Sequence, residues 1–190
     1  MENLPDLFQA AIRLERTLHG LGYRFCFIGG IAVQRWGEPR STIDLDVSLL
    51  TGFGDEGRYL DTILETFDGR IDDARGFALL NRVLLVRDRS GTPIDIALAA
   101  MPFEERTVER ATRFQLNDTD GITTCSATDL IVHKAFANRD VDWRDVRSIL
   151  IRSAHEVDQA TVFAELTPLA ELKEEPEILE KLERLFTDLS

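Results

Sequence analysis

Cysteine and long apolar runs are both scarce in this chain of 190 residues, and each scarcity excludes a class of protein. Cys26 and Cys125 are far apart and form no CxxC pattern, so we expect neither a disulfide framework nor a structural zinc site, and a reducing cytoplasm is the expected setting. No stretch approaches the ~20 apolar residues of a membrane span. Residues 1–6 are acidic and lack the basic start of a signal peptide. We therefore expect no membrane segment.

Basic residues are also outnumbered, with 22 Lys and Arg against 34 Asp and Glu, a formal net charge of −12. Broad, non-specific binding to nucleic acid is therefore disfavoured, because phosphate repels such a surface. A local basic groove remains compatible with this balance. Apolar residues make up 44% of the chain, which is enough to bury a core and excludes a disordered chain. The length predicts one domain, or one core with a small helical appendage.

The order of predicted elements favours an α+β fold, with a small mixed-sheet core followed by a helical C-terminal region. The spacing of apolar residues predicts helices over 4–21, 31–36, around 59–67 and over 102–113, and strands over 23–28, 43–50, 77–80, 83–86 and 93–98. A polar turn at 117–121 is the best candidate boundary. We therefore expect a catalytic core of residues 1–120 and a helical region of residues 121–190, with helices near 126–138, 141–153, 158–167 and 169–188.

Two acids on an otherwise apolar strand carry the clearest chemical signal. Asp44 and Asp46 are two residues apart, so on a strand they share a face with their Cβ atoms ~6–7 Å apart. Like charges held this close raise one another's pKa values unless a cation neutralises them. Hard oxygen ligands at this spacing suit Mg²⁺, which also binds substrate phosphates. The alternative interpretation is a solvent-facing edge strand.

Asp95 lies between apolar neighbours on a second predicted strand, and it can join the pair if the two strands are adjacent; an exposed hairpin position is the alternative. Gly29 and Gly30 end one strand and open a helix, which lets backbone N–H groups approach an anion closely. Arg40 and Thr42 precede the acids and could touch a triphosphate, or they are an ordinary surface arginine and strand residue. A phosphate cradle beside metal-binding acids is the arrangement that nucleotidyl transfer needs.

This pattern resembles the nucleotidyltransferase superfamily with the DNA-polymerase-β-like fold. The segment Gly29-Gly30, followed by residues 40–46 (RSTIDLD), is similar to the AbiEii-type group, which includes bacterial toxin and phage-defence nucleotidyltransferases. Residues 129–134 (DLIVHK), followed by Arg139, Asp142 and Asp145, are similar to the lysine and aspartate motifs of that group. The resemblance covers roughly residues 20–150.

The resemblance implies a magnesium-dependent transfer of a nucleoside monophosphate from an NTP to a hydroxyl acceptor. Asp44 and Asp46 would hold two magnesium ions, and Asp95 would hold the catalytic one and help to activate the acceptor hydroxyl. The glycine pair would position the triphosphate. At its second position the superfamily often has serine, so Gly30 removes a hydroxyl, and phosphate binding would rest on the backbone and nearby basic groups.

The same resemblance assigns roles in the helical region. Lys134 would contact phosphate or nucleotide, and Asp145 would be its partner or contact the base; a lone helical lysine is otherwise usually solvated. Asp142 caps the following helix or pairs with Arg139. The three histidines show no metal-ligand spacing.

The acceptor stays open at this point: an RNA such as tRNA, a protein hydroxyl or a small alcohol. A cognate antitoxin is the protein partner that the resemblance suggests. Two alternative functions remain: a catalytically silent nucleotide-binding module that acts through a protein partner, and an adenylyltransferase that modifies a small molecule such as an antibiotic.

Overall fold

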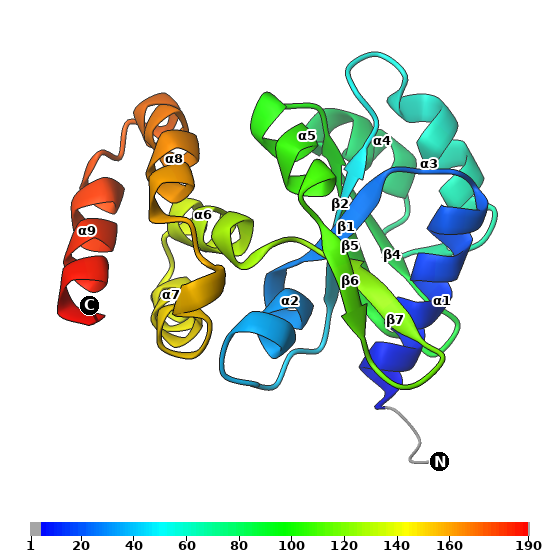
Figure 1. Ribbon diagram of the computed structural model, residues 1–190. Helices are drawn as coiled ribbons and strands as arrows, with labels where there is room; N and C mark the ends of the chain where they lie inside the picture. The colour runs from blue at the N-terminus through cyan, green and yellow to red at the C-terminus, as the bar shows by residue number, and fades with distance from the viewer. Residues whose placement is uncertain (1–4, 190) are drawn as a thin grey trace. The chain divides into compact units, whose positions relative to one another are not determined.

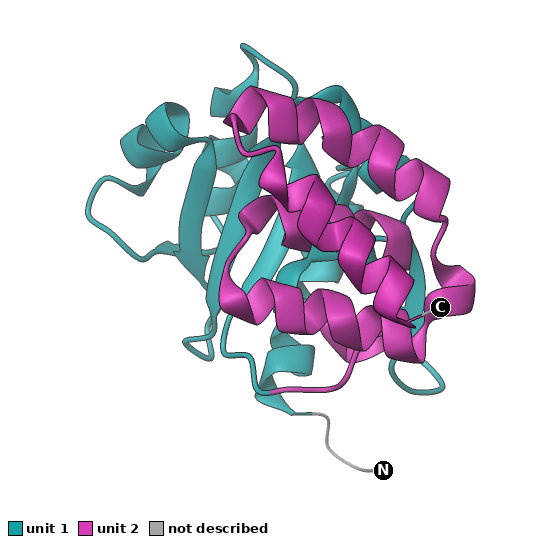
Figure 2. Ribbon diagram, turned by 90° about the vertical axis from the view of Figure 1, so that its left-hand side faces the viewer, with its two compact units in different colours: residues 1–31, 41–125 teal, residues 32–40, 126–190 magenta. Residues whose placement is uncertain are grey.

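The computed structural model describes residues 5–189, which fall into two compact units (Figure 2). Unit 1 consists of residues 1–31 and 41–125, and unit 2 of residues 32–40 and 126–190. A mixed sheet and helices make up the described chain (Figure 1), which confirms the α+β class. The predicted division after residue 120 stays a prediction; residues 121–125 belong to unit 1 by their contacts.

Unit 1 is built on a seven-stranded sheet with the order β3-β4-β5-β2-β1-β7-β6. The strands are β1 (Phe25–Ile28), β2 (Leu45–Leu50), β3 (Asp68–Gly69), β4 (Val83–Arg87), β5 (Pro93–Ala99), β6 (Thr112–Gln115) and β7 (Gly121–Thr124). The pairs β2–β5 and β1–β7 are parallel, and the other neighbours are antiparallel. Two strands far apart in the sequence, β2 and β5, therefore lie side by side at the centre.

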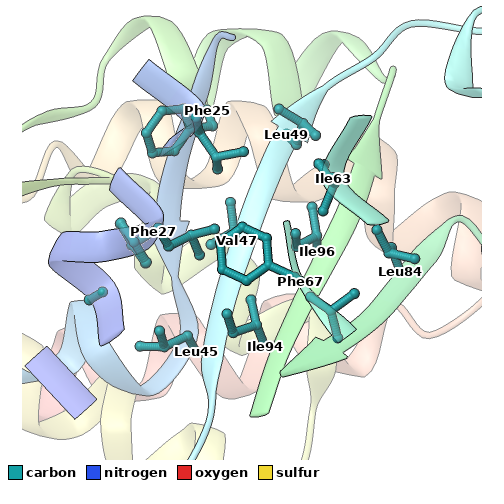
Figure 3. Close-up of a cluster of buried hydrophobic side chains, with 14 of the residues drawn as sticks. Phe25, Phe27, Leu45, Val47, Leu49, Ile63, Phe67, Leu84, Ile94 and Ile96 are labelled. Atoms are coloured by element: carbon teal, nitrogen blue, oxygen red, sulfur yellow. The ribbon is translucent and has the colours of Figure 1, made fainter. Parts of the chain in front are cut away.

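Alternation along the central strands separates an apolar face from a polar one. On β2, Leu45, Val47 and Leu49 are fully buried. They stand in register with the apolar residues of β5 at 94, 96 and 98 (Figure 3). Buried side chains from α1 (Asp6–Gly20), α3 (Glu56–Leu64) and α4 (Ala74–Asn81) complete this core. Because side chains alternate across a strand, the acids of β2 and β5 point to the opposite face.

Several predicted elements of unit 1 are present. The helix predicted from residue 4 begins at Asp6, and Leu4 lies outside the described residues. The strand predicted over 43–50 begins only at Leu45. The prediction was wrong for Ile43, which lies outside the strand and is 77% exposed. The short helix α2 (Gly29–Trp36) starts at the glycine pair itself, two residues earlier than predicted.

Two predictions in unit 1 were wrong. Residues 77–80 are not a strand but part of α4, because the Asp73 carboxylate accepts a hydrogen bond from Gly76 N–H at the N-terminus (2.8 Å) and Arg82 ends the helix in the left-handed region. The helix predicted over 102–113 ends sooner, as α5 (Pro102–Glu109), and is followed by β6. Pairing of β6 with β7 overrides the helical spacing there.

Unit 2 is helical. Its helices are α6 (Ala127–Ala137), α7 (Asp140–Arg152), a 3₁₀ turn (Ala154–Glu156), α8 (Gln159–Lys173) and α9 (Glu177–Leu189), and residues 32–36 add the end of α2. Ser126 caps α6, since its hydroxyl accepts a hydrogen bond from Asp129 N–H. The break predicted at Pro168 was wrong. The buried stripe of Val162, Leu166 and Ala170 continues across that proline, and the helix ends at Glu174.

Within residues 5–189, no helix combines the length and the apolar character that crossing a bilayer demands.

Candidate functional site

Three acids occupy the polar face of the sheet in unit 1. Asp46 on β2 and Asp95 on β5 are direct register partners on neighbouring parallel strands, so the condition on which Asp95 could join the pair is met. Asp44 lies in the bend just before β2, and its charge adds to the rise of the pKa of Asp95. The end of β1 joins them, because Ile28 is the register partner of Asp46. The fold thus brings the acids and the start of the glycine pair to one place in the sheet.

The glycine pair is needed there for space. Gly29 has φ of +61°, and a Cβ added to it would lie 2.6 Å from Cγ of Asp46 and closer still to Oδ2. A Cβ at Gly30 would lie 2.9 Å from Cβ of Thr42 and closer to Oγ1. Only hydrogen fits at both positions, so the backbone at the start of α2 lies directly against a carboxylate and a hydroxyl.

Thr42 explains why position 30 has a glycine where the superfamily that the sequence resembles often has a serine. Its Oγ1 occupies the space that a side chain at position 30 would fill, and it donates a hydrogen bond to Asp44 Oδ1 (3.0 Å). A serine at position 30 therefore has no room beside this threonine. The hydroxyl that the glycine removes is replaced, in nearly the same place, by one from the segment that precedes β2.

Asp95 is held by an arginine that no sequence motif marks. Arg70, which follows β3, donates from Nη2 to Asp95 Oδ1, while its own Nε is buried without a hydrogen-bond partner. Burial raises the pKa of Asp95 above its ordinary value; the Arg70 charge works against this rise, and the nearby Asp44 charge adds to it. Both side chains are partly exposed, at 34% for Asp95 and 27% for Arg70.

The donor set of the acids fits a hard divalent cation, because it consists of carboxylate oxygens whose charges repel one another. Within residues 5–189, however, no group of three or more His, Cys, Asp or Glu is already arranged to hold a metal ion. One oxygen of Asp95 accepts the hydrogen bond from Arg70.

A second charged cluster lies inside unit 2. Lys134 on α6 is 5% exposed, and its Nζ lies 3.1 Å from Asp142 Oδ1 and 2.8 Å from Asp145 Oδ2 on α7. Arg40 donates to both oxygens of Asp145, each at 2.8 Å, and Arg139 donates to both oxygens of Asp142, at 2.6 and 3.1 Å. Three cations thus surround two buried carboxylates.

Burial alone would raise the pKa values of Asp142 and Asp145. Hydrogen bonds from Arg139 and Lys134 to Asp142, and from Arg40 and Lys134 to Asp145, outweigh burial and lower both values below the ordinary range. Both acids are therefore ionised at neutral pH. Asp142, which the sequence linked only to a cap or to Arg139, is also a partner of Lys134.

The solved structures that match this chain include two that extend over nearly its whole length. An antigenic nucleotidyltransferase-like protein from Paracoccidioides brasiliensis matches with a TM-score of 0.50 and 16% identity, covering 92% of this chain and 91% of that one. The antibiotic-resistance factor ANT(2'')-Ia matches with a TM-score of 0.54 and 11% identity, covering 90% and 95%. No family model and no curated protein matches the sequence significantly.

The fold is that of nucleotidyltransferase-like proteins. The predicted site residues of this chain divide between the two units. Unit 1 contains Gly29, Gly30, Thr42, Asp44, Asp46 and Asp95, and unit 2 contains Arg40, Lys134 and Asp145. Each set is assembled within its own unit, and the roles of the residues towards a nucleotide stay predictions.

Proposed function

We propose that this chain is a magnesium-dependent nucleotidyltransferase, which moves a nucleoside monophosphate from an NTP to a hydroxyl acceptor. The observation that carries the proposal is the register of Asp46 with Asp95, beside Asp44 and directly against Gly29. Acids are uncommon inside strands and costly to bury, so two in register on the central strands, with a third just before β2, need a reason beyond stability. Grouping them beside a glycine-opened helix suits a bound metal–triphosphate.

The residues of unit 1 would divide the work as follows. The backbone N–H groups at Gly29 and Gly30, which open α2, would bind the triphosphate. Asp44 and Asp46 bind the cations, and the Thr42 hydroxyl orients Asp44. Asp95 binds the catalytic cation and takes part in activating the acceptor hydroxyl, for which a raised pKa suits a carboxylate that must hold a proton briefly.

Bound magnesium, two ions in this proposal, would neutralise the negative charge that develops on the α-phosphate. The chain itself would hold the reacting groups in place. The sheet would position the acids, and the glycine pair would position the phosphates.

The cluster of unit 2 would supply positive charge towards a nucleotide. Lys134, Arg40 and Arg139 carry one more charge than Asp142 and Asp145 neutralise. Lys134 would contact phosphate or nucleotide, with Asp145 holding it in place. Arg40 is 35% exposed at its side chain, so it can reach a ligand while it keeps its bond to Asp145.

The finer part of the proposal follows the sequence motif. Residues 29–30 and 40–46 support an AbiEii-type, toxin-like enzyme, with an RNA such as tRNA as acceptor and an antitoxin as partner. A small alcohol is the competing acceptor, as in a factor that modifies an antibiotic.

The test is transfer of label from each α-³²P NTP, with Mg²⁺, to total RNA, to protein and to small aminoalcohols. Asp44→Asn and Asp46→Asn should each reduce the transfer at least a hundredfold, because removing transition-state charge stabilisation costs ~10²–10³ in rate. Asp61→Asn is the matched control, since Asp61 pairs with Arg75 on the surface of the same unit. Undiminished labelling in both site variants would disprove the proposal.

A second candidate function has one specific observation in its favour. Arg70 already neutralises Asp95, as it would in a silent nucleotide-binding module that acts through a protein partner. Such a module would bind NTP without releasing pyrophosphate. Pyrophosphate release in the wild-type protein therefore separates the two functions.

A further inference from the structure

Unit 2 has a hollow of about 690 Å³ between the end of α2 and the exposed face of α7. Arg144, Arg147 and Ile151 line it at positions i, i+3 and i+7 of α7, so they share one face of that helix. Pro39 lines it from the segment after α2. The opposite face of α7 carries the buried acids of the charged cluster and its apolar residues.

Hydrogen bonds hold this hollow in shape. Glu38 N–H donates to Ser148 Oγ (3.2 Å), and the Arg152 guanidinium donates to the Gly37 carbonyl. Gly37 allows the close approach, because a Cβ there would lie 2.5 Å from Ser148 Oγ. At the end of the segment that follows α2, Arg40 donates two hydrogen bonds to Asp145. The segment after α2 is therefore fixed to α7 before any ligand binds.

Two cations in the hollow have no partner. Among residues 5–189, no carboxylate or other acceptor pairs with Arg144 or Arg147, and both are exposed. Other arginines of unit 2 behave differently: Arg40, Arg139 and Arg184 each pair with an acid. In a chain with 34 acids and 22 bases, two neighbouring arginines without an acid are unexpected. Their ligand is more plausibly an external anion than the protein itself.

The apolar part of the lining narrows the class of anion. Ile151 is 64% exposed, and Pro39 lies in the same hollow. A ligand that covers these side chains while meeting two guanidinium groups needs flat apolar surfaces between repeated negative charges. Single-stranded nucleic acid has both, since its bases alternate with phosphates, and arginine binds phosphate through two parallel hydrogen bonds.

We propose that this hollow binds a single-stranded segment of RNA, with Arg144 and Arg147 on successive phosphates and a base against Ile151 and Pro39. The choice of RNA rests on the proposed function, in which it is the acceptor. Glu38 also lines the hollow, and its charge limits the number of phosphates that can bind there. The overall charge of −12 weakens the binding further, so the affinity depends strongly on salt.

The test is fluorescence anisotropy of a labelled, unstructured 12-nucleotide RNA, titrated with the full chain between 30 and 200 mM salt without metal. The double variant Arg144→Gln/Arg147→Gln should bind at least about tenfold more weakly at low salt. Each lost phosphate contact should lower the salt slope by about 0.7, hence about 1.4 for both. Arg184→Gln removes the same charge from α9 and should bind as the wild type does.

Unchanged affinity in the double variant, or no binding by the folded wild type at 30 mM salt, would overturn the inference. Polyglutamate that displaces the RNA through the same two arginines would assign the hollow to an acidic protein instead. Circular dichroism checks that every variant is folded.

The variant pair Asp44→Asn/Asp46→Asn keeps the inference separate from the proposed function. In that variant pair, RNA binding should be unchanged. RNA binding by the wild type that depends on Arg144 and Arg147, without any nucleotide transfer by the wild type, would refute only the proposed function. Transfer to a small alcohol by a chain that binds no RNA would refute only the inference.

Discussion

At the scale of single residues, the lack of a side chain at Gly29 decides whether the acids can be placed at all. Its φ of +61° and the Asp46 carboxylate beside it both exclude a Cβ. Gly29→Ala should therefore lower the free energy of unfolding by about 2–5 kcal/mol, from left-handed backbone strain together with overpacking. Urea unfolding followed by circular dichroism measures the loss.

Gly52 offers a matched control, because its φ is +70° and nothing lies within 4 Å of an added Cβ. Gly52→Ala should cost only the backbone part, about 1–2 kcal/mol. If both variants lose the same free energy of unfolding, the Asp46 side chain moves aside at little cost, and its close packing against Gly29 does not constrain the site.

Arg70 sets the charge that a metal ion meets. With Asp44, Asp46 and Asp95 ionised, its guanidinium leaves two negative charges, and removing it leaves three. Arg70→Gln should therefore bind Mn²⁺ about tenfold more tightly, since a unit charge some 6 Å from a divalent ion is worth about 1–2 kcal/mol in water-like surroundings. Electron paramagnetic resonance of free Mn²⁺ measures the affinity without any turnover.

Arg75→Gln removes the same charge from the surface pair with Asp61 and is the control for that titration. Weaker Mn²⁺ binding in Arg70→Gln than in this control would mean that Arg70 orients Asp95 for the metal and does not compete with it.

At the scale of elements, the sequence predicts what depends on local pattern. The alternation of apolar and polar residues predicted the strand β2, and a single acid within an apolar run marked Asp95. The central strands and their acids could therefore be predicted. Residues 77–80 are a short apolar run, which fits a buried strand as well as a helix, and the cap at Asp73 decides between them.

Long-range pairs could not be predicted in the same way. Arg70 meets Asp95 across 25 residues, and Arg40 meets Asp145 across 105. Nothing in the neighbours of Arg70 marks it, because its position depends on the pairing of β3 with β4, and β3 has only two residues. The sequence therefore predicted the acids of the site but not the positive charge of Arg70 beside them.

The residue that ends α8 limits the stability that this helix contributes. Glu174 ends this helix in the left-handed region, with φ of +60°, where glycine is favoured. Glu174→Gly should raise the free energy of unfolding by about 1 kcal/mol, because the strain at this residue disappears. Thermal unfolding should show a higher midpoint. Glu171→Gly, inside the same helix, should instead cost about 1 kcal/mol, and a loss in both variants would contradict this account of the helix end.

At the scale of the whole molecule, the buried charges of unit 2 tie stability to pH. Asp142 and Asp145 have pKa values below the ordinary value, so the folded state binds protons less readily than the unfolded state does. Their contribution to stability is complete above the unfolded value of about 3.9 and is lost as the pH falls through the lower folded values. Acid should therefore destabilise the protein steeply below about pH 4.

Asp145→Asn tests this origin of the acid sensitivity. The variant should be about 3 kcal/mol less stable at pH 7, because Arg40 and Lys134 lose their shared carboxylate. Its unfolding midpoint should then fall less than that of the wild type between pH 5 and pH 3, because one of the two titrating groups is gone. Asp140→Asn removes an exposed acid from the same helix and should keep the wild-type slope. An equally steep fall in Asp145→Asn would place the acid sensitivity outside this cluster, and the cluster would then be a source of positive charge for a ligand without being a source of acid-sensitive stability.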